Sequence, residues 1–166
     1  MTSLLTPRNI FLLIVFVCVG SMAAAFYFEY VMGLEPCPLC MTQRFFMVLT
    51  GVIAIVALIH RPKTVGVTIY SLVCALMAFA GSFFSGRQVW LQSLPPEEVP
   101  ACGPPLEYIM ENFPLLDALQ VLLAGDGNCS EVLWQFFGMS MPMWVLIVFV
   151  GLGVLSLSNV VWVRRG

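Results

Sequence analysis

The chain has 166 residues, of which 60% are hydrophobic and only 10% are charged, and its mean hydropathy is +0.97. A soluble domain of this length is nearer half apolar and a quarter charged. The composition therefore excludes a water-soluble globular fold and predicts one compact unit, over residues 1–166, that crosses a membrane several times. The formal net charge is −2, and we expect no nucleic acid partner.

Four apolar runs predict four transmembrane helices, over residues 10–28, 45–59, 65–84 and 143–163. A helix needs about 20 apolar residues to cross a hydrocarbon core, and the first run comes close to that length. A cleavable signal peptide is the alternative for this run, because Ala23-Ala24-Ala25 resembles a small-residue cleavage site. The apolar character continues through Phe28, which favours a retained span.

The basic residues predict the orientation of these spans. Four spans place both termini on one side, and that side holds five basic residues, Arg8, Arg61, Lys63, Arg164 and Arg165. The opposite side holds only Arg44 and Arg87, together with all nine acidic residues. The positive-inside rule therefore predicts cytoplasmic termini and an outward-facing segment over residues 29–44 and another over 85–142. In bacteria the outer compartment is oxidising, so disulfides form and persist there.

The long outer segment, 85–142, contains several prolines, which exclude regular helix over much of its length. Residues 114–123 differ, because leucines cover most of a helical surface on which Asp117 and Gln120 share one face. This pattern predicts a short helix that either lies in the lipid headgroup region or packs on the protein itself. The expected fold class is an all-α membrane protein, a four-helix transmembrane bundle with a long periplasmic loop containing this short interfacial helix.

The first outer segment ends in Glu35-Pro36-Cys37-Pro38-Leu39-Cys40-Met41-Thr42-Gln43-Arg44. A C-x-x-C pair either cycles between dithiol and disulfide or supplies two ligands to a metal. The prolines around Cys37 predict that a helix begins here, and a thiol at a helix N-terminus is favoured as thiolate. Arg44 lies one turn beyond Cys40, where it either stabilises a thiolate and an anionic acceptor or reaches for lipid headgroups.

Two further cysteines, Cys102 and Cys129, lie in the long outer segment. On spacing alone, a structural disulfide that staples the loop is favoured, worth roughly 3 kcal/mol by chain entropy. The alternative is a second redox pair that exchanges disulfides with the first. A four-thiolate metal site is a third interpretation, although the second pair lacks C-x-x-C spacing. Cys18 and Cys74 fall within the spans and are expected to be structural.

The layout resembles the disulfide bond formation protein B (DsbB) family. The resemblance rests on Pro-Cys37-Pro-Leu-Cys40 followed by Arg44, on the four spans, and on the long outer loop. It extends to Trp90-Leu91-Gln92 before Cys102, to Gly127-Asn128-Cys129, and to Met141-Pro142-Met143-Trp144 at the start of the last span. Vitamin K epoxide reductase-like enzymes rank lower, because their membrane-side C-x-x-C comes late in the chain.

The resemblance implies an inner-membrane thiol:quinone oxidoreductase that reoxidises a periplasmic DsbA-like dithiol protein. It implies that Cys102 forms the mixed disulfide with that partner and that Cys129 completes the loop pair. Electrons would then pass to the Cys37–Cys40 disulfide, with Cys40 as the thiolate beside the quinone.

The same resemblance implies a quinone cofactor, ubiquinone or menaquinone, drawn from the membrane pool and held in part by Arg44. Some family members have a histidine near the quinone, where this chain has Gln88, flanked by Arg87. We expect Gln88 and Arg87 to border the quinone, and we expect no metal.

Overall fold

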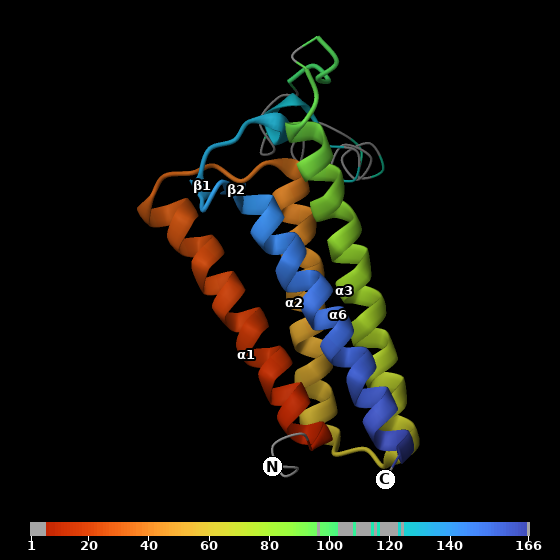
Figure 1. Cartoon of the computed structure of the whole chain (residues 1–166). Helices are drawn as coiled ribbons and strands as arrows, with labels where there is room; N and C mark the ends of the chain where they lie inside the picture. The colour runs from red at the N-terminus through yellow and green to blue at the C-terminus, as the bar shows by residue number, and fades with distance from the viewer. Residues whose placement is uncertain are drawn as a thin grey trace.

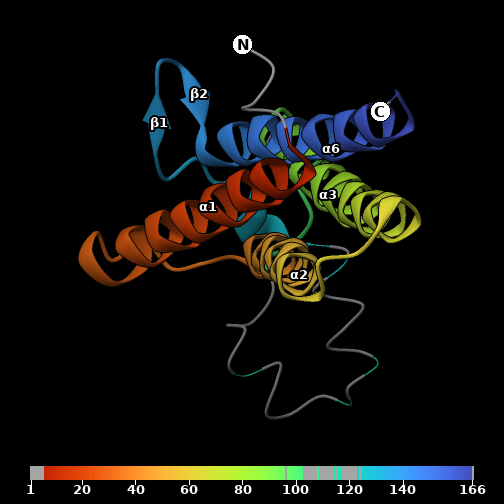
Figure 2. The same ribbon diagram turned by 90° about the horizontal axis from the view of Figure 1, so that it is seen from below.

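The computed structural model describes residues 6–95, 97–102 and 125–165, together with residues 108, 114, 116 and 123. In this part of the chain four long helices form an elongated bundle (Figure 1). They are α1 (Pro7–Phe26), α2 (Pro38–His60), α3 (Thr64–Gln92) and α6 (Met141–Arg165). Contacts join α1 to α2, α2 to α3, α3 to α6 and α6 to α1, so the helices close into a ring, which Figure 2 shows from one end.

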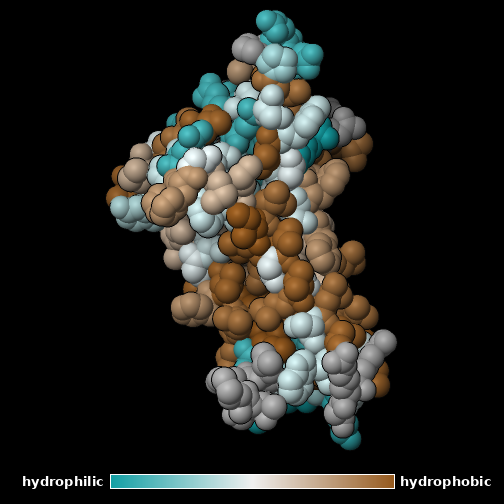
Figure 3. Space-filling model, viewed as in Figure 1, coloured by the Kyte–Doolittle hydropathy of each residue, from teal (hydrophilic) through white to brown (hydrophobic). Residues whose placement is uncertain are grey.

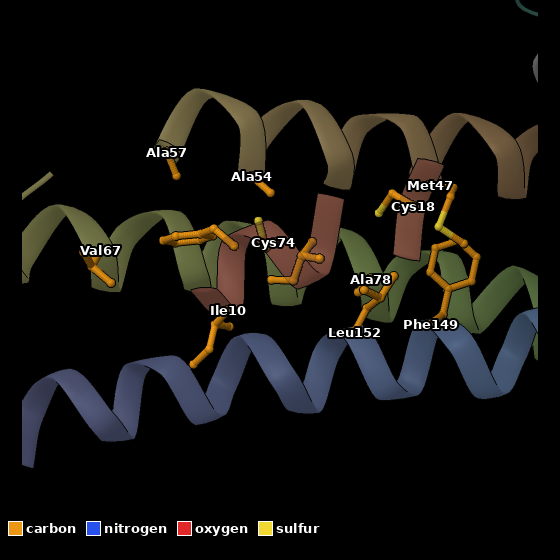
Figure 4. Packing of buried hydrophobic residues seen from close by; sticks show 12 residues of the cluster. Ile10, Cys18, Met47, Ala54, Ala57, Val67, Cys74, Ala78, Phe149 and Leu152 are labelled. Carbon is orange, nitrogen blue, oxygen red and sulfur yellow. The ribbon is translucent and has the colours of Figure 1, made fainter. Parts of the chain in front are cut away.

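The interior of the bundle is apolar and is lined by small side chains where the helices approach closely. Cys74 and Ala78 of α3 and Phe149 of α6 are fully buried, and Figure 4 shows them among the side chains that meet between the helices. An ideal Cβ on Gly81 would lie 2.4 Å from the Phe149 ring, so only glycine allows α6 this close to α3. Cys18 and Cys74 belong to this cluster, as small hydrophobes do.

Each of the four long helices is apolar and long enough to cross a membrane. On the face that Figure 3 shows, an apolar belt crosses the middle of the molecule, with hydrophilic residues toward its ends. The predicted fold class, an all-α protein with four membrane spans, is confirmed. Helix α1 begins and α6 ends at one end of the bundle, which we call the terminal end (Figure 1). The short helix expected over residues 114–123 lies almost wholly outside the described residues.

The opposite end, which we call the cysteine end, differs in detail from the sequence-based prediction. Helix α1 continues into a π-helical turn, η1 (Tyr27–Val31), and α2 begins at Pro38 with Cys37 as its N-cap, as the prolines predict. Helix α3 extends to Gln92, eight residues beyond the expected span end at residue 84. In these extra turns Gln88 is buried beside Gln43 and the sulfurs at the start of α2. Leu91 is buried beside Cys129, which lies in a 3-10 turn of the returning loop, η2 (Gly127–Ser130).

A small antiparallel hairpin precedes α6. Its strands, β1 (Gln135–Phe136) and β2 (Met139–Ser140), are joined by Phe137 and Gly138, whose φ angles are 51° and 74°. Two positive φ angles suit the right-handed twist of a two-residue hairpin. The sequence did not indicate this turn, because phenylalanine rarely adopts a positive φ.

Candidate redox site

The C-x-x-C pair lies at the start of α2, where the N-cap geometry brings its two sulfurs together. The Sγ atoms of Cys37 and Cys40 are 2.8 Å apart, and Cys37 Sγ also accepts a hydrogen bond from the backbone N–H of Cys40 at 3.4 Å. The three-residue spacing places Cys40 one turn into the helix, directly beneath the N-cap. The pair is therefore positioned to interconvert between dithiol and disulfide with little movement of the backbone.

A third cysteine joins this pair from the long loop. Cys129, in η2, is fully buried beside Leu39 and Leu91, and Cys37 packs against this cluster. This contact raises the pKa of Cys37, with help from Cys40 and from burial, and it lowers the pKa of Cys129. The neighbouring sulfurs therefore favour the protonated form of Cys37 and the thiolate form of Cys129. A thiolate beside Cys37 is the arrangement that thiol–disulfide exchange requires.

Cys102 lies on the outer side of the same loop and is exposed. Its segment is joined to η2 by a hydrogen bond from the backbone N–H of Gly127 to the carbonyl of Ala101, at 3.3 Å. An ideal Cβ on Gly127 would lie 3.0 Å from Cys102 Sγ and 2.4 Å from the carbonyl oxygen of Pro100, so the approach requires glycine. The four outer cysteines therefore lie in the order Cys102 at the surface, then Cys129, Cys37 and Cys40.

Two buried glutamines adjoin the sulfurs. Gln88 Nε2 lies 3.3 Å from Cys37 Sγ and 3.4 Å from Cys40 Sγ, so the amide donates toward both. Its Oε1 accepts a 2.7 Å hydrogen bond from Gln43 Nε2 and lies 3.7 Å from Cys40 Sγ, close enough to accept from the protonated thiol. By occupying Oε1, Gln43 turns the N–H groups of Gln88 toward the sulfurs. Sequence reasoning missed Gln43, although it lies three residues after Cys40 and hence on the same helix face.

Arg44 is held by the end of α1. It forms an ion pair with Glu29, its Nη2 donates to the carbonyl of Ala25 at 3.3 Å, and its guanidinium lies 5.6 Å from the centre of the Phe26 ring. Both charged side chains are largely buried, so the pair is more than a solvated surface contact. Sequence reasoning missed Glu29, and its position in the π-helical turn η1 is the only local signal, since such turns are frequent at functional sites.

A cavity opens beside the sulfurs, between α1, α2, α3 and α6 and beneath the loop. Most of its wall is apolar, contributed by Met22, Phe28, Met47, Leu133 and Val145, and its polar lining includes Cys40, Arg44 and Gln88. A quinone ring needs an apolar slot with polar groups beside its carbonyl oxygens. The guanidinium of Arg44 can donate to one of them, and Gln88, whose N–H groups point to the sulfurs, borders the same cavity. The residues present therefore fit a quinone. Arg87 is exposed on α3 rather than buried with Gln88.

These features define a multi-pass membrane protein that gathers cysteines from two segments at one end of a helical bundle. The sequence model of the family described as "Disulfide bond formation protein DsbB" matches residues 7–159. Disulfide bond formation protein B of Methylococcus capsulatus is 49% identical over 152 residues, covering 92% of this chain and 93% of that protein. The protein of the same name from Hahella chejuensis is 45% identical over 165 residues, 99% of each chain.

Disulfide bond formation protein B 1 of Pseudomonas aeruginosa is 41% identical over 162 residues, covering 98% of each chain. The chain belongs to the DsbB family. Membership confirms the resemblance drawn from its motifs and implies an oxidoreductase role in disulfide formation.

Proposed function

We propose that this protein is an inner-membrane thiol:quinone oxidoreductase that reoxidises a periplasmic DsbA-like dithiol protein and passes the electrons to the membrane quinone pool. The observation that carries the proposal is the order of the sulfurs, from exposed Cys102 through buried Cys129 and Cys37 to Cys40 at the cavity. A soluble protein cannot enter the bilayer and a lipid-soluble acceptor cannot leave it. A series of sulfurs that extends from the protein surface to the cavity therefore connects the soluble protein with the lipid-soluble acceptor.

The exchange begins at the loop pair. A thiolate of the partner attacks Cys102 of a Cys102–Cys129 disulfide, forming a mixed disulfide and releasing the Cys129 thiolate. The second partner thiol displaces Cys102, so the partner leaves oxidised and the loop pair is left reduced. Two electrons have then moved from the partner to Cys102 and Cys129.

The second exchange passes these electrons inward. Cys129 attacks Cys37 of the Cys37–Cys40 disulfide, which breaks the Cys37–Cys40 bond and releases Cys40 as a thiolate. Cys102 then displaces Cys37 from Cys129, restoring the loop disulfide and leaving Cys37 as a thiol.

The Cys40 thiolate remains at the cavity, where Gln88 donates to its sulfur and the Arg44 guanidinium adds positive charge. Re-formation of the Cys37–Cys40 disulfide would release two electrons and the proton of Cys37. The cavity would hold the acceptor, ubiquinone or menaquinone, which would leave as quinol after taking up these electrons, that proton and a second proton from water. Arg44 would hold one of the quinone oxygens, Gln88 would border the quinone ring, and the prediction that Arg87 assists electrostatically is kept as part of the proposal. The basic residues at the terminal end support cytoplasmic termini and a periplasmic cysteine end.

Replacement of Cys40 by serine tests the proposal. Because serine forms neither the motif disulfide nor a thiolate, partner-dependent quinone reduction should fall to the background rate. The assay uses purified protein in lipid vesicles, a reduced DsbA-like protein and a quinone whose reduction is followed by absorbance. Cys74→Ala, which removes a buried thiol of the bundle core, is the matched control and should stay active. Survival of quinone reduction in Cys40→Ser would show that electrons take another route.

Replacing Glu29 by glutamine should weaken quinone binding without slowing the first exchange. The change removes the charge that holds Arg44, and loss of a hydrogen bond between charged groups costs about 1.5 kcal/mol, so KM for quinone should rise about tenfold. Steady-state kinetics at varied quinone measure this. Glu98→Gln removes an exposed carboxylate on the same side of the membrane and should leave KM unchanged. An unchanged KM in Glu29→Gln would remove Glu29 from the site.

A further inference from the structure

A second cavity lies at the terminal end of the bundle, far from the cysteines. Its volume is about 410 Å³, and it opens between the start of α1, the turn from α2 to α3, and the last turns of α6. Two arginines, Arg8 of α1 and Arg61 of the turn, line its rim together with Thr64. The wall that continues toward the middle of the bundle is apolar and includes Phe11, Val67 and Val163.

The arginines of this cavity have no counter-ion among the residues that the structure describes. The side chains of Arg8 and Arg61 are exposed, and neither forms an ion pair within the described part of the chain. Helices α1, α2, α3 and α6 contain no aspartate or glutamate, and neither does the turn that carries Arg61. Two guanidinium groups therefore face one cavity that no Asp or Glu side chain of these helices neutralises, which favours an external anion.

The start of α3 adds hydrogen-bond donors to the same rim. Its N-cap, Lys63, makes no side-chain capping bond, so the first N–H groups of α3 have no capping side chain to accept from them. Thr64, the first residue of α3, lines the cavity beside Arg61. Free N–H groups at a helix N-terminus complement a phosphate, and here they supplement the two arginines.

We propose that this cavity binds the phosphate of an anionic phospholipid, with an acyl chain lying along its apolar wall. The rim lies where the bundle meets the lipid headgroups, and the wall of Phe11, Val67 and Val163 runs into the apolar belt. Basic pockets between membrane helices bind anionic headgroups in this way. A zwitterionic headgroup suits the site less well, because its ammonium group finds no acidic residue in these helices.

The test is native mass spectrometry of the full-length protein, freed of endogenous lipid and titrated with phosphatidylglycerol or phosphatidylcholine. The protein should retain one phosphatidylglycerol per chain and bind it in preference to phosphatidylcholine. Because a hydrogen bond to a charged group contributes about 1.5 kcal/mol, Arg8→Gln and Arg61→Gln should each weaken this binding about tenfold. Lys63→Gln is the matched control, since Lys63 is an exposed cation in the same turn that does not line the cavity, and it should retain the bound lipid.

Thermal unfolding supplies a second readout that does not depend on enzymatic activity. Phosphatidylglycerol should raise the unfolding temperature of the natural chain and of Lys63→Gln, but not of the Arg8→Gln, Arg61→Gln double variant. An equal loss of binding in Lys63→Gln would indicate diffuse attraction to a charged surface and overturn the proposal. Displacement of the lipid by inorganic phosphate would also overturn it, because the site would then bind a free anion.

Discussion

Replacement of Cys129 by alanine will abolish electron transfer from the protein partner while leaving the C-x-x-C pair reducible by a small dithiol. Cys129 is fully buried against Cys37, so it is the sulfur through which the loop reaches the motif. Without it, Cys102 still meets the partner at the surface, but the electrons have no path inward. Quinone reduction driven by the reduced partner should fall to the background rate, whereas dithiothreitol should still support it by reducing Cys37–Cys40 directly.

The two electron donors make this result specific. A misfolded variant would lose quinone reduction with both donors. A folded variant that lacks only Cys129 loses quinone reduction with the protein partner and keeps it with dithiothreitol. Cys18→Ala removes a buried thiol from the bundle core and should keep both activities. If Cys129→Ala retained the rate with the protein partner, electrons would reach Cys37 without Cys129, and the proposed order of exchange would be wrong.

Replacement of Gln43 by glutamate will slow electron transfer from the motif about tenfold. In the natural chain Gln43 donates to Gln88 Oε1, so the Gln88 amide N–H groups face the sulfurs. A carboxylate at position 43 accepts hydrogen bonds but donates none, so it attracts Nε2 of Gln88 and turns Oε1 toward Cys40. The Cys40 thiolate then loses a donor, and a hydrogen bond to a charged group contributes about 1.5–3 kcal/mol.

Single-turnover quinone reduction after rapid mixing with a dithiol measures this step apart from partner binding. Gln135→Glu adds the same charge on the exposed hairpin and should leave the rate unchanged. Gln43→Met removes the donor without introducing a charge, so the Gln88 amide is no longer fixed and an intermediate rate is expected. Equal rates for the natural chain, Gln43→Met and Gln43→Glu would show that the orientation of Gln88 has no influence on Cys40.

The fold could be predicted from the sequence because membrane spans follow from hydrophobicity alone. The motif also predicted where α2 begins, since Pro38 has no N–H to lose at the first helical position. The extension of α3 to Gln92 was not predicted, because its burial depends on the loop that returns as η2. Periodicity within one segment does not indicate what a distant segment covers.

The site could be predicted only in part, for a related reason. Four cysteines and Arg44 were recognisable from residue type and spacing, but their neighbours were not. The contact between Cys129 and Cys37 joins segments far apart in the chain, and spacing alone favoured a loop staple instead. Glu29 and Gln43 matter through the partners they reach after folding, and as single polar residues they resemble any others at a membrane surface.

The central claim is that the loop delivers electrons to the motif at Cys37 through Cys129. It is tested most directly in the Cys40→Ser, Cys102→Ser double variant, which keeps only these two outer sulfurs. After mild oxidation, mass spectrometry of unreduced peptides should find a Cys37–Cys129 disulfide in most chains, whereas the Cys40→Ser, Cys129→Ser variant should form little Cys37–Cys102 bond. Recovery of Cys37 and Cys129 as separate, alkylatable thiols would contradict the account.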